Sequence, residues 1–167
     1  MFIMPKKSIL TPDFRSEVIQ GRQDAFNIAN TIKRAILDSK SQSDSIAYKF
    51  VGENDYQTCK NLYNYIRHNI RYKKEQSSLQ TAKTLGRILF DKNSGNDCKH
   101  FTIISCSILR SLKIPCKMRL ISQNFYSVEP THIYCVANVN GNDVILDACI
   151  SEFDKEANYK YKYDIKF

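Results

Sequence analysis

Residues 95–112 read GNDCKHFTIISCSILRSL, in which a polar turn leads through Cys98 into a long apolar segment. The apolar residues of this segment repeat at helical spacing, so it is predicted to be a helix. At about 100° per residue, Cys98 lies on the same face as Ile104 and Ile108, so its sulfur is expected to face the core. A helix N-terminus favours the thiolate, the reactive form of cysteine, through its free backbone N–H groups and the positive end of its dipole. Cys98 is therefore the candidate nucleophile.

Three strands are predicted to follow this helix. Residues 113–115, Lys-Ile-Pro, end the helix because the residue before a proline disfavours helical backbone. Segments typical of strands then lie at 116–122, 131–139 and 144–150, and Asn140-Gly141 is a strong hairpin signal between the last two. A helix followed by an antiparallel sheet indicates an α+β fold.

The hairpin determines how His132 and Asp147 lie relative to each other. With a two-residue turn at 140–141, Asp147 lies opposite Tyr134 and on the same face of the sheet as His132. Diagonal neighbours are about 7–8 Å apart in backbone terms, which long side chains can span. We therefore expect His132 to act as the base toward Cys98, and Asp147 to orient the imidazole.

A first amphipathic helix is predicted near the N-terminus. Residues 11–12, Thr-Pro, suit a helix start, and apolar residues at 14–36 follow helical spacing, although Gly21 weakens the middle. The serine-rich segment 39–45 is predicted to be a loop, followed by a short apolar piece at 46–51.

A second amphipathic helix is predicted to begin near Asn54 or Asp55. Its apolar residues repeat at helical spacing and form one stripe: Cys59, Leu62, Tyr63, Ile66 and Ile70. The segment 71–96 that follows is irregular, with a short helical turn expected at 84–90.

Length and composition favour a single compact unit. A chain of 167 residues can bury a core without disulfides, and its six cysteines form no Cys-x-x-Cys pair, so we expect reduced thiols and a cytoplasmic protein. Residues 1–45 are predicted to be a helical extension packed on a core formed by residues 46–167. No apolar run has the length of a signal peptide or a membrane span, so no membrane partner is expected.

The formal net charge of +8 permits an acidic partner, but the basic residues are spread along the chain without a Lys/Arg block. Nucleic acid is therefore not the expected partner. At the C-terminus, five apolar residues alternate with charged, mostly basic ones: Tyr159, Tyr161, Tyr163, Ile165 and Phe167. This period of two predicts a last strand on the domain's own sheet, and a docking strand for a protein partner is the alternative.

Four motifs occur in order: YIRHNIRY at 65–72, Asn-Asp-Cys at 96–98, Pro-Thr-His-Ile-Tyr at 130–134 and Val-Ile-Leu-Asp at 144–147. With them, residues 62–152 resemble the transglutaminase-like superfamily of papain-like cysteine enzymes, in particular small single-domain forms of bacteria and their phages. The resemblance implies a nucleophile helix packed on an antiparallel sheet, with further helices before it. For a phage protein it would imply the host cytoplasm or the virion as location.

The resemblance also implies a reaction, acyl transfer at an amide of a protein or peptide through a thioester, with no cofactor. Cys98 would be the nucleophile, His132 the base and later the acid, and Asp147 the group that fixes the imidazole. Water as acceptor would give hydrolysis, and a lysine amine would give a cross-link. Animal members of the family use a Trp as an extra oxyanion donor; this chain has none, so Tyr72 and Gln80 are the candidates.

The chain departs from the family pattern in two places. The usual Gly-Asp-Cys is Gly-Asn-Asp-Cys at 95–98, which alters the turn before the sulfur. The acidic residue often found after the cysteine is replaced by Lys99 and His100, which changes the charge at the mouth of the cleft. His100, about 200° around the helix from Cys98, is expected at the surface or behind the site. An idle module with a structural or protein-contact role, as in a phage particle, is the alternative to an enzyme.

A zinc site is the chemical rival to a nucleophile. It would be built from Cys98, His100 and either Cys106 or Cys116. Structural zinc prefers paired ligands on turns, and a cysteine and a histidine on opposite sides of one helix cannot converge on one ion. The sequence therefore predicts no metal.

Overall fold

The computed structural model describes residues 15–19, 25–76 and 80–167. Its elements in chain order are β1 (Ser16–Ile19), α1 (Ala25–Asp38), α2 (Lys40–Ile46), the 3-10 helix η2 (Ala47–Phe50), α3 (Asp55–Asn69), β2 (Gln80–Lys83), α4 (Leu85–Phe90), α5 (Cys98–Ser111), β3 (Cys116–Ser122), β4 (His132–Val139), β5 (Asn142–Leu146) and β6 (Tyr161–Lys166).

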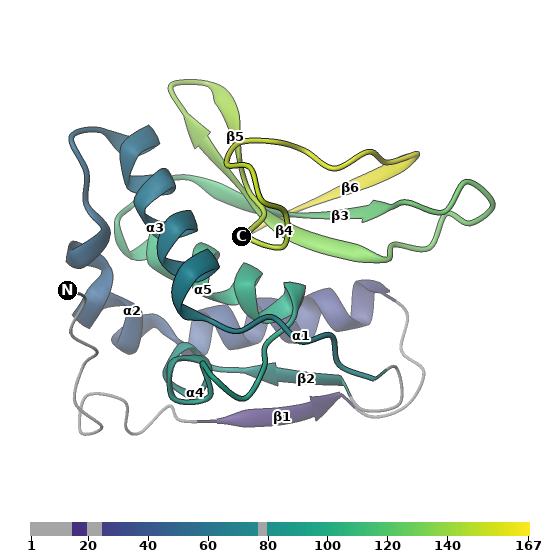
Figure 1. Cartoon of the computed structure of the whole chain (residues 1–167), viewed down its shortest axis with the longest axis horizontal. Helices are drawn as coiled ribbons and strands as arrows, with labels where there is room; N and C mark the ends of the chain where they lie inside the picture. Colours follow the sequence, from purple (N-terminus) through teal and green to yellow (C-terminus); the bar gives the residue numbers. More distant parts are fainter. Residues whose placement is uncertain (1–14, 20–24, 77–79) are drawn as a thin grey trace.

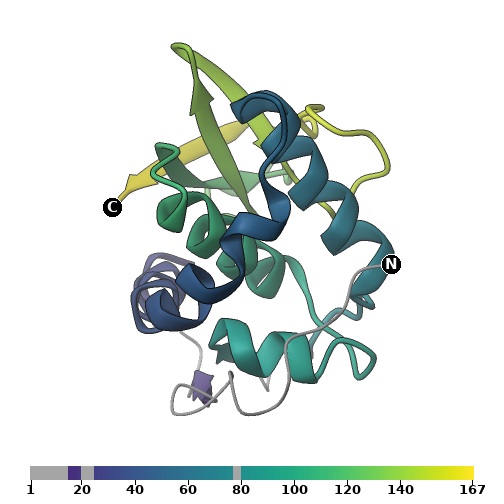
Figure 2. The same cartoon turned by 90° about the vertical axis from the view of Figure 1, so that its left-hand side faces the viewer.

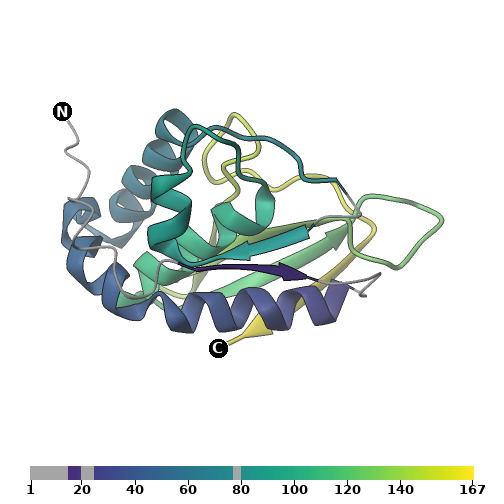
Figure 3. The same cartoon turned by 90° about the horizontal axis from the view of Figure 1, so that it is seen from below.

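Helix α5 forms the centre of the molecule. It packs on β3 and β4 of a four-stranded antiparallel sheet on one side, and on α1, α2 and α4 on the other (Figure 1, Figure 2). Its side chains from position 99 to position 109 are all buried. On the face of α5 that points away from the large sheet, α1 lies beside the small β1–β2 sheet (Figure 3). The predicted α+β fold, a helix packed on an antiparallel sheet with further helices before it, is confirmed.

The large sheet has the order β5-β4-β3-β6, and its β4–β5 hairpin turns where the sequence predicts. Asn140 and Gly141 have φ values of 53° and 86°, the positive values that a two-residue turn of this kind requires at both positions. Val139 pairs with Asn142 across the turn. The predicted register is therefore confirmed, and it places Asp147, the residue after β5, on the His132 face.

The last two strands differ in how well their predicted limits hold. Strand β5 ends at Leu146 rather than at 150, because Asp147 begins a turn in which its carbonyl accepts a hydrogen bond from the Ile150 N–H at 3.2 Å. Strand β6 pairs with β3 as the edge of the large sheet. The ring of Tyr163 packs against Phe26 of α1, with centroids 5.3 Å apart, so the C-terminal strand lies on the domain's own sheet.

The N-terminal prediction is wrong in part. Residues 16–19 form β1, which pairs with β2, instead of the first turns of a helix, and α1 begins at Ala25. The backbone of 16–19 thus satisfies its N–H and C=O groups across strands, a long-range pairing that local periodicity does not reveal. The predicted helix start at 11–12 and Gly21 lie outside the described residues.

The segment 39–45, predicted to be a loop, is mostly helix α2. Three of its polar side chains are buried, those of Ser39, Gln42 and Ser43. The Ser39 hydroxyl accepts from the Leu85 N–H at 2.9 Å, and the Gln42 amide oxygen accepts from the Gly86 N–H at 2.7 Å. Both contacts satisfy free N–H groups in the first turn of α4. The serine-rich composition therefore reflects a buried helix contact and not a solvated loop.

The other helices agree with the sequence. Helix α3 begins after Asn54, whose side chain accepts from the Gln57 N–H at 2.8 Å, and α4 lies within the predicted 84–90 turn. All six cysteines are free thiols. In the parts of the chain that the structure describes, no helix combines the length and the hydropathy needed to cross a bilayer.

Candidate active site

Cys98 is the first residue of α5, and the turn that presents it is tightly fixed. Gly95 has φ 109°, and a Cβ at this position would lie 2.6 Å from the Lys73 Cβ, so the close approach of the two backbones requires glycine. Asn96, the extra residue relative to the family pattern, is fully buried. Its N–H donates to the Arg71 carbonyl at 2.9 Å, and its carbonyl accepts from the Lys73 N–H at 2.9 Å. The altered turn is therefore anchored to the segment after α3.

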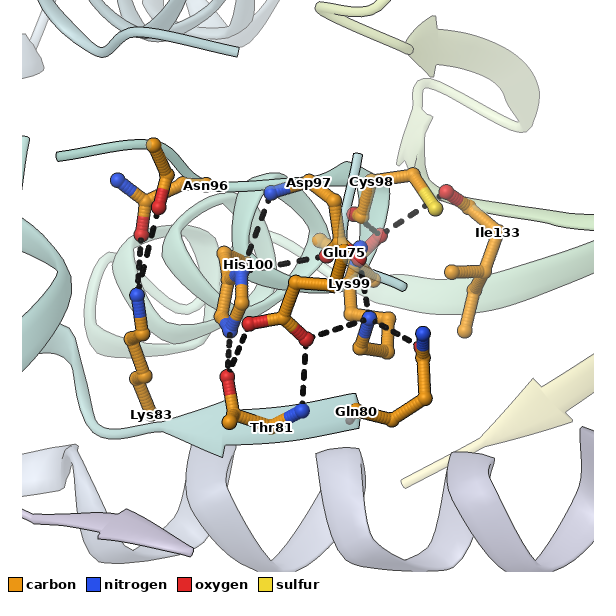
Figure 4. Close-up of polar contacts among 12 residues, drawn as sticks. Glu75, Gln80, Thr81, Lys83, Asn96, Asp97, Cys98, Lys99, His100 and Ile133 are labelled. Carbon is orange, nitrogen blue, oxygen red and sulfur yellow. Dashed lines mark hydrogen bonds and ion pairs between the residues drawn. The ribbon is translucent and has the colours of Figure 1, made fainter. Parts of the chain in front are cut away.

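Asp97 and His100 cap the start of α5 reciprocally. The Asp97 carboxylate accepts from the Lys99 N–H at 3.2 Å, and the Asp97 N–H donates to His100 Nδ1 at 3.1 Å. His100 is fully buried, so its predicted place at the surface is wrong, whereas its place behind the site is right. Its Nε2 contacts the Thr81 hydroxyl of β2 at 3.3 Å (Figure 4).

Lys99 is buried, and it lines the cleft that contains Cys98. Its side chain is 5% exposed, and its ammonium contacts the carboxylates of Asp97 and, at 3.3 Å, Glu75 (Figure 4). Burial acts to raise the pKa of Asp97, but hydrogen bonds and charge from His100 and Lys99 hold it well below its usual range. The lysine charge is thus present at the cleft, paired with two carboxylates, Asp97 and Glu75, that line the same cleft.

His132 and Asp147 come together as the hairpin register predicts. His132 Nε2 lies 2.7 Å from Asp147 Oδ2, and the other carboxylate oxygen accepts from the Cys149 N–H at 3.1 Å. Asp147 is 2% exposed, so both of its oxygens are fixed in the interior. Because Asp147 holds Nε2, the second ring nitrogen of His132 is left for Cys98.

The charge state of His132 reflects its two partners. Burial alone would lower the pKa of this imidazole, but hydrogen bonds to Asp147 and Cys98, with their negative charges, raise it to about 10. An imidazolium beside a helix N-terminus is the environment in which a cysteine is held as thiolate. His132 is therefore held in its charged form beside the start of α5.

Cys149 is a second thiol at the site, which the sequence analysis missed. Its sulfur, His132 and Asp147 lie with their donor atoms within 4.8 Å of one another. Burial and the nearby charges of Asp147 and Cys98 raise the pKa of Cys149 far above its usual range, so this thiol keeps its proton. Its position two residues after Asp147, in the turn that follows β5, is the signal that could have found it.

Cys98 and His132 line a cleft of about 330 Å³. The apolar wall of this cleft comes from α1 and β3: Ala25, Ile28, Ile32 and Leu120. Tyr72 and Gln80, the two predicted oxyanion donors, lie on the polar wall.

The two donor candidates are held in different ways. Burial, followed by the charges around Cys98, raises the pKa of Tyr72, so its hydroxyl keeps a proton to donate. The Gln80 amide oxygen accepts from Lys99 at 2.7 Å and its nitrogen donates to the Gln76 carbonyl at 2.8 Å, which fixes the plane of the amide. Lys99 with Asp97, Glu75 and Gln80, which we call the Lys99 cluster, therefore links the start of α5 to the polar lining of the cleft.

Two solved structures of low sequence identity share the fold. A candidate cysteine protease from Cytophaga hutchinsonii is 21% identical with a TM-score of 0.51, and the match covers 80% of this chain and 48% of that one. A candidate protease from Parabacteroides distasonis ATCC 8503 is 12% identical with a TM-score of 0.52, and the match covers 70% of this chain and 25% of that one. The chain thus spans about half of the first protein and a quarter of the second.

No curated protein sequence matches the chain significantly. The sequence profile of the transglutaminase-like superfamily, however, matches residues 44–142, which include Cys98 and His132. This match extends over more than half of the sequence and agrees with the arrangement of α5 and the large sheet. The chain belongs to the transglutaminase-like superfamily.

Proposed function

We propose that this chain is a cysteine hydrolase of amide bonds in proteins or peptides. Cys98 is its nucleophile, His132 its base and acid, and Asp147 the group that orients the imidazole. The observation that carries the proposal is the 2.7 Å contact of His132 Nε2 with buried Asp147, which leaves the other ring nitrogen for the thiol at the start of α5. Nucleophile, base and orienting group are thus linked in the order that the chemistry needs.

The first half of the reaction forms a thioester. The Cys98 thiolate attacks the carbonyl carbon, and the carbonyl oxygen gains negative charge as the C–S bond forms. The Cys98 N–H at the start of α5, together with Tyr72 or Gln80, donates hydrogen bonds to this oxyanion. The Lys99 N–H takes no part because it already donates to Asp97. The His132 imidazolium then gives its proton to the nitrogen of the leaving amine, and the C–N bond breaks.

The second half of the reaction returns the enzyme to its starting state. Neutral His132 takes a proton from water, and the resulting hydroxide attacks the thioester and releases the acid and the thiolate. Asp147 stabilises the imidazolium each time it forms. The two similar structures are both described as candidate proteases, which favours water over a lysine amine as the acceptor.

Peptide processing provides the direct test. The purified chain is incubated with a peptide mixture, with and without an added primary amine, and products are identified by mass spectrometry. We expect cleavage that is lost in Cys98→Ala and kept in Cys149→Ala, the matched control beside the same histidine. Deamidation instead of cleavage would identify a side-chain amide as the bond attacked, and amine incorporation would identify an amine as the acceptor. No Cys98-dependent product would favour the idle-module alternative.

Thiol reactivity tests the site without any substrate. Alkylation of each cysteine is followed by mass spectrometry against pH in the parent and in His132→Ala. We expect Cys98 to react fastest near neutral pH and to slow by about tenfold or more in the variant, because the imidazolium stabilises the thiolate. Equal reactivity of Cys98 and Cys149 would contradict the proposed ion pair.

A further inference from the structure

Three thiols that the proposed reaction does not use gather between α5 and the large sheet. Cys106 of α5, Cys116 of β3 and Cys135 of β4 have sulfur atoms that all lie within 4.8 Å of one another. Cys106 and Cys135 are completely buried, whereas Cys116 is partly exposed. We call these three residues the thiol cluster.

The strand register argues against a disulfide between Cys116 and Cys135. Cys116 pairs with Ala137, and Met118 pairs with Cys135, so the two strand cysteines are diagonal neighbours. Diagonal Cα atoms lie about 7–8 Å apart. That separation exceeds the roughly 7 Å limit that a disulfide can bridge without backbone movement.

A metal ion fits the same spacing without such movement. Bonds between zinc and thiolate are about 2.3 Å long, so three thiolates around one ion have their sulfurs about 4 Å apart. The three side chains also converge from three different elements, as the ligands of a metal site do. Their spacing therefore fits a shared ion, and all three are free thiols.

The cluster has a route to solvent. Cys116 lines a surface cleft of about 580 Å³, separate from the one at Cys98. Four basic side chains line the same cleft: Arg110, Lys113, Lys117 and Lys166. Lys117 is paired with Asp143 and Asp164. Three thiolates around a divalent ion carry one net negative charge, which the charge of Arg110 at this cleft helps to offset. Arg110 is fixed above the Phe167 ring, 4.5 Å from its centroid.

We propose that Cys106, Cys116 and Cys135 bind a soft divalent cation such as zinc through three thiolates, with the fourth coordination position open to the cleft. Each thiol loses its proton to solvent as its bond to the metal forms, so one ion releases three protons and no electron is transferred. The ion would join α5 to β3 and β4. Two of these elements carry Cys98 and His132, so the site would also stabilise the frame of the catalytic cleft.

A cadmium titration of the reduced, metal-free full chain tests the proposal. Cd²⁺ is the probe because its bonds to thiolate absorb in the near ultraviolet, and protons released into a weak buffer are counted in parallel. We expect one ion per chain, three protons per ion and displacement of bound Zn²⁺ by Cd²⁺. Cys116→Ser should lose about a third of the absorbance per ion and weaken binding by about tenfold or more.

Cys98→Ser is the matched control, because it removes the thiol at the other cleft. We expect this variant to bind like the parent; loss of binding there, with binding kept in Cys116→Ser, would overturn the proposal. X-ray absorption of the zinc-loaded parent needs no variant and should show three sulfur ligands at about 2.3 Å. Absence of thiolate absorbance at saturating Cd²⁺ would show that the cluster is packing alone.

Discussion

Helix α5 carries thiols in two places, Cys98 in its first turn and Cys106 about two turns later. Strand β4 provides a partner for each, His132 for the first and Cys135 for the second. The first thiol meets a helix N-terminus, an imidazolium and a cleft, whereas Cys106 is enclosed by apolar side chains and two other thiols. The same residue type on the same helix thus differs in chemistry because its neighbours differ. Replacing one thiol, or one of its neighbours, tests this contrast.

The largest effect should come from exchanging the nucleophile. Cys98→Ala should lower kcat/KM for peptide cleavage by about four orders of magnitude or more, because no other group forms the thioester. Cys116→Ser at the second cleft should leave kcat/KM within about twofold, since it touches none of the reacting groups. Steady-state kinetics of the two variants measure the contrast. A large loss in both would show that the two thiol sites are not independent.

The next effect should come from the charges beneath Cys98. Lys99→Met leaves the buried carboxylates of Asp97 and Glu75 without their cation, so the free energy of unfolding should fall by about 3–5 kcal/mol. Lys117→Met is the control, because this lysine also contacts two carboxylates but lies nearer to solvent, and its loss should cost about 1 kcal/mol or less. Urea denaturation measures both. Equal costs would mean that the start of α5 is held by packing rather than by charge.

His132 should make stability depend on pH. Its pKa is raised from 6.5 to about 10 in the folded chain, so the folded state binds more protons than the unfolded state between these values. The stabilisation is complete below about pH 6.5 and is lost as pH rises through about 10, with a slope of at most about 1.4 kcal/mol per pH unit.

His132→Gln isolates this contribution. The raised pKa values of Cys106 and Cys135 also make stability fall with rising pH, but they do so equally in the parent and in the variant. The difference between the two unfolding curves from about pH 7 to 10 therefore reports His132 alone. Parallel curves would show that the imidazole is not held charged by Asp147 and Cys98.

Most of the candidate site follows from short-range patterns in the sequence. The polar turn before an apolar helix gives Cys98 its place, and the Asn140-Gly141 turn fixes the hairpin register that joins His132 to Asp147. These features depend on local backbone geometry, which residue types largely determine.

The parts that the sequence did not predict depend on contacts between distant segments. Strand β1 exists because β2 pairs with it, and Ser39 and Gln42 are buried where they accept hydrogen bonds from the first turn of α4. The Lys99 cluster needs Glu75, from an irregular segment with no pattern of its own. The thiol cluster was missed for the same reason, since Cys106, Cys116 and Cys135 have no metal-ligand spacing along the chain.

The smallest expected effect is the cost in unfolding free energy of removing one sulfur, either that of Cys135 in β4 or that of Cys98 in α5. In the metal-free chain, Cys135→Ala removes a completely buried sulfur and leaves a small cavity, so the free energy of unfolding should fall by about 1 kcal/mol. Cys98→Ala removes a partly exposed sulfur at the edge of a cleft and should cost less than this. Thermal and urea unfolding measure the difference in stability between the two variants. Zinc should increase this difference, because it stabilises Cys98→Ala, which keeps all three ligands, and not Cys135→Ala, which lacks one. A difference that zinc leaves unchanged would assign Cys135 to packing, while Cys98 would keep its role in chemistry.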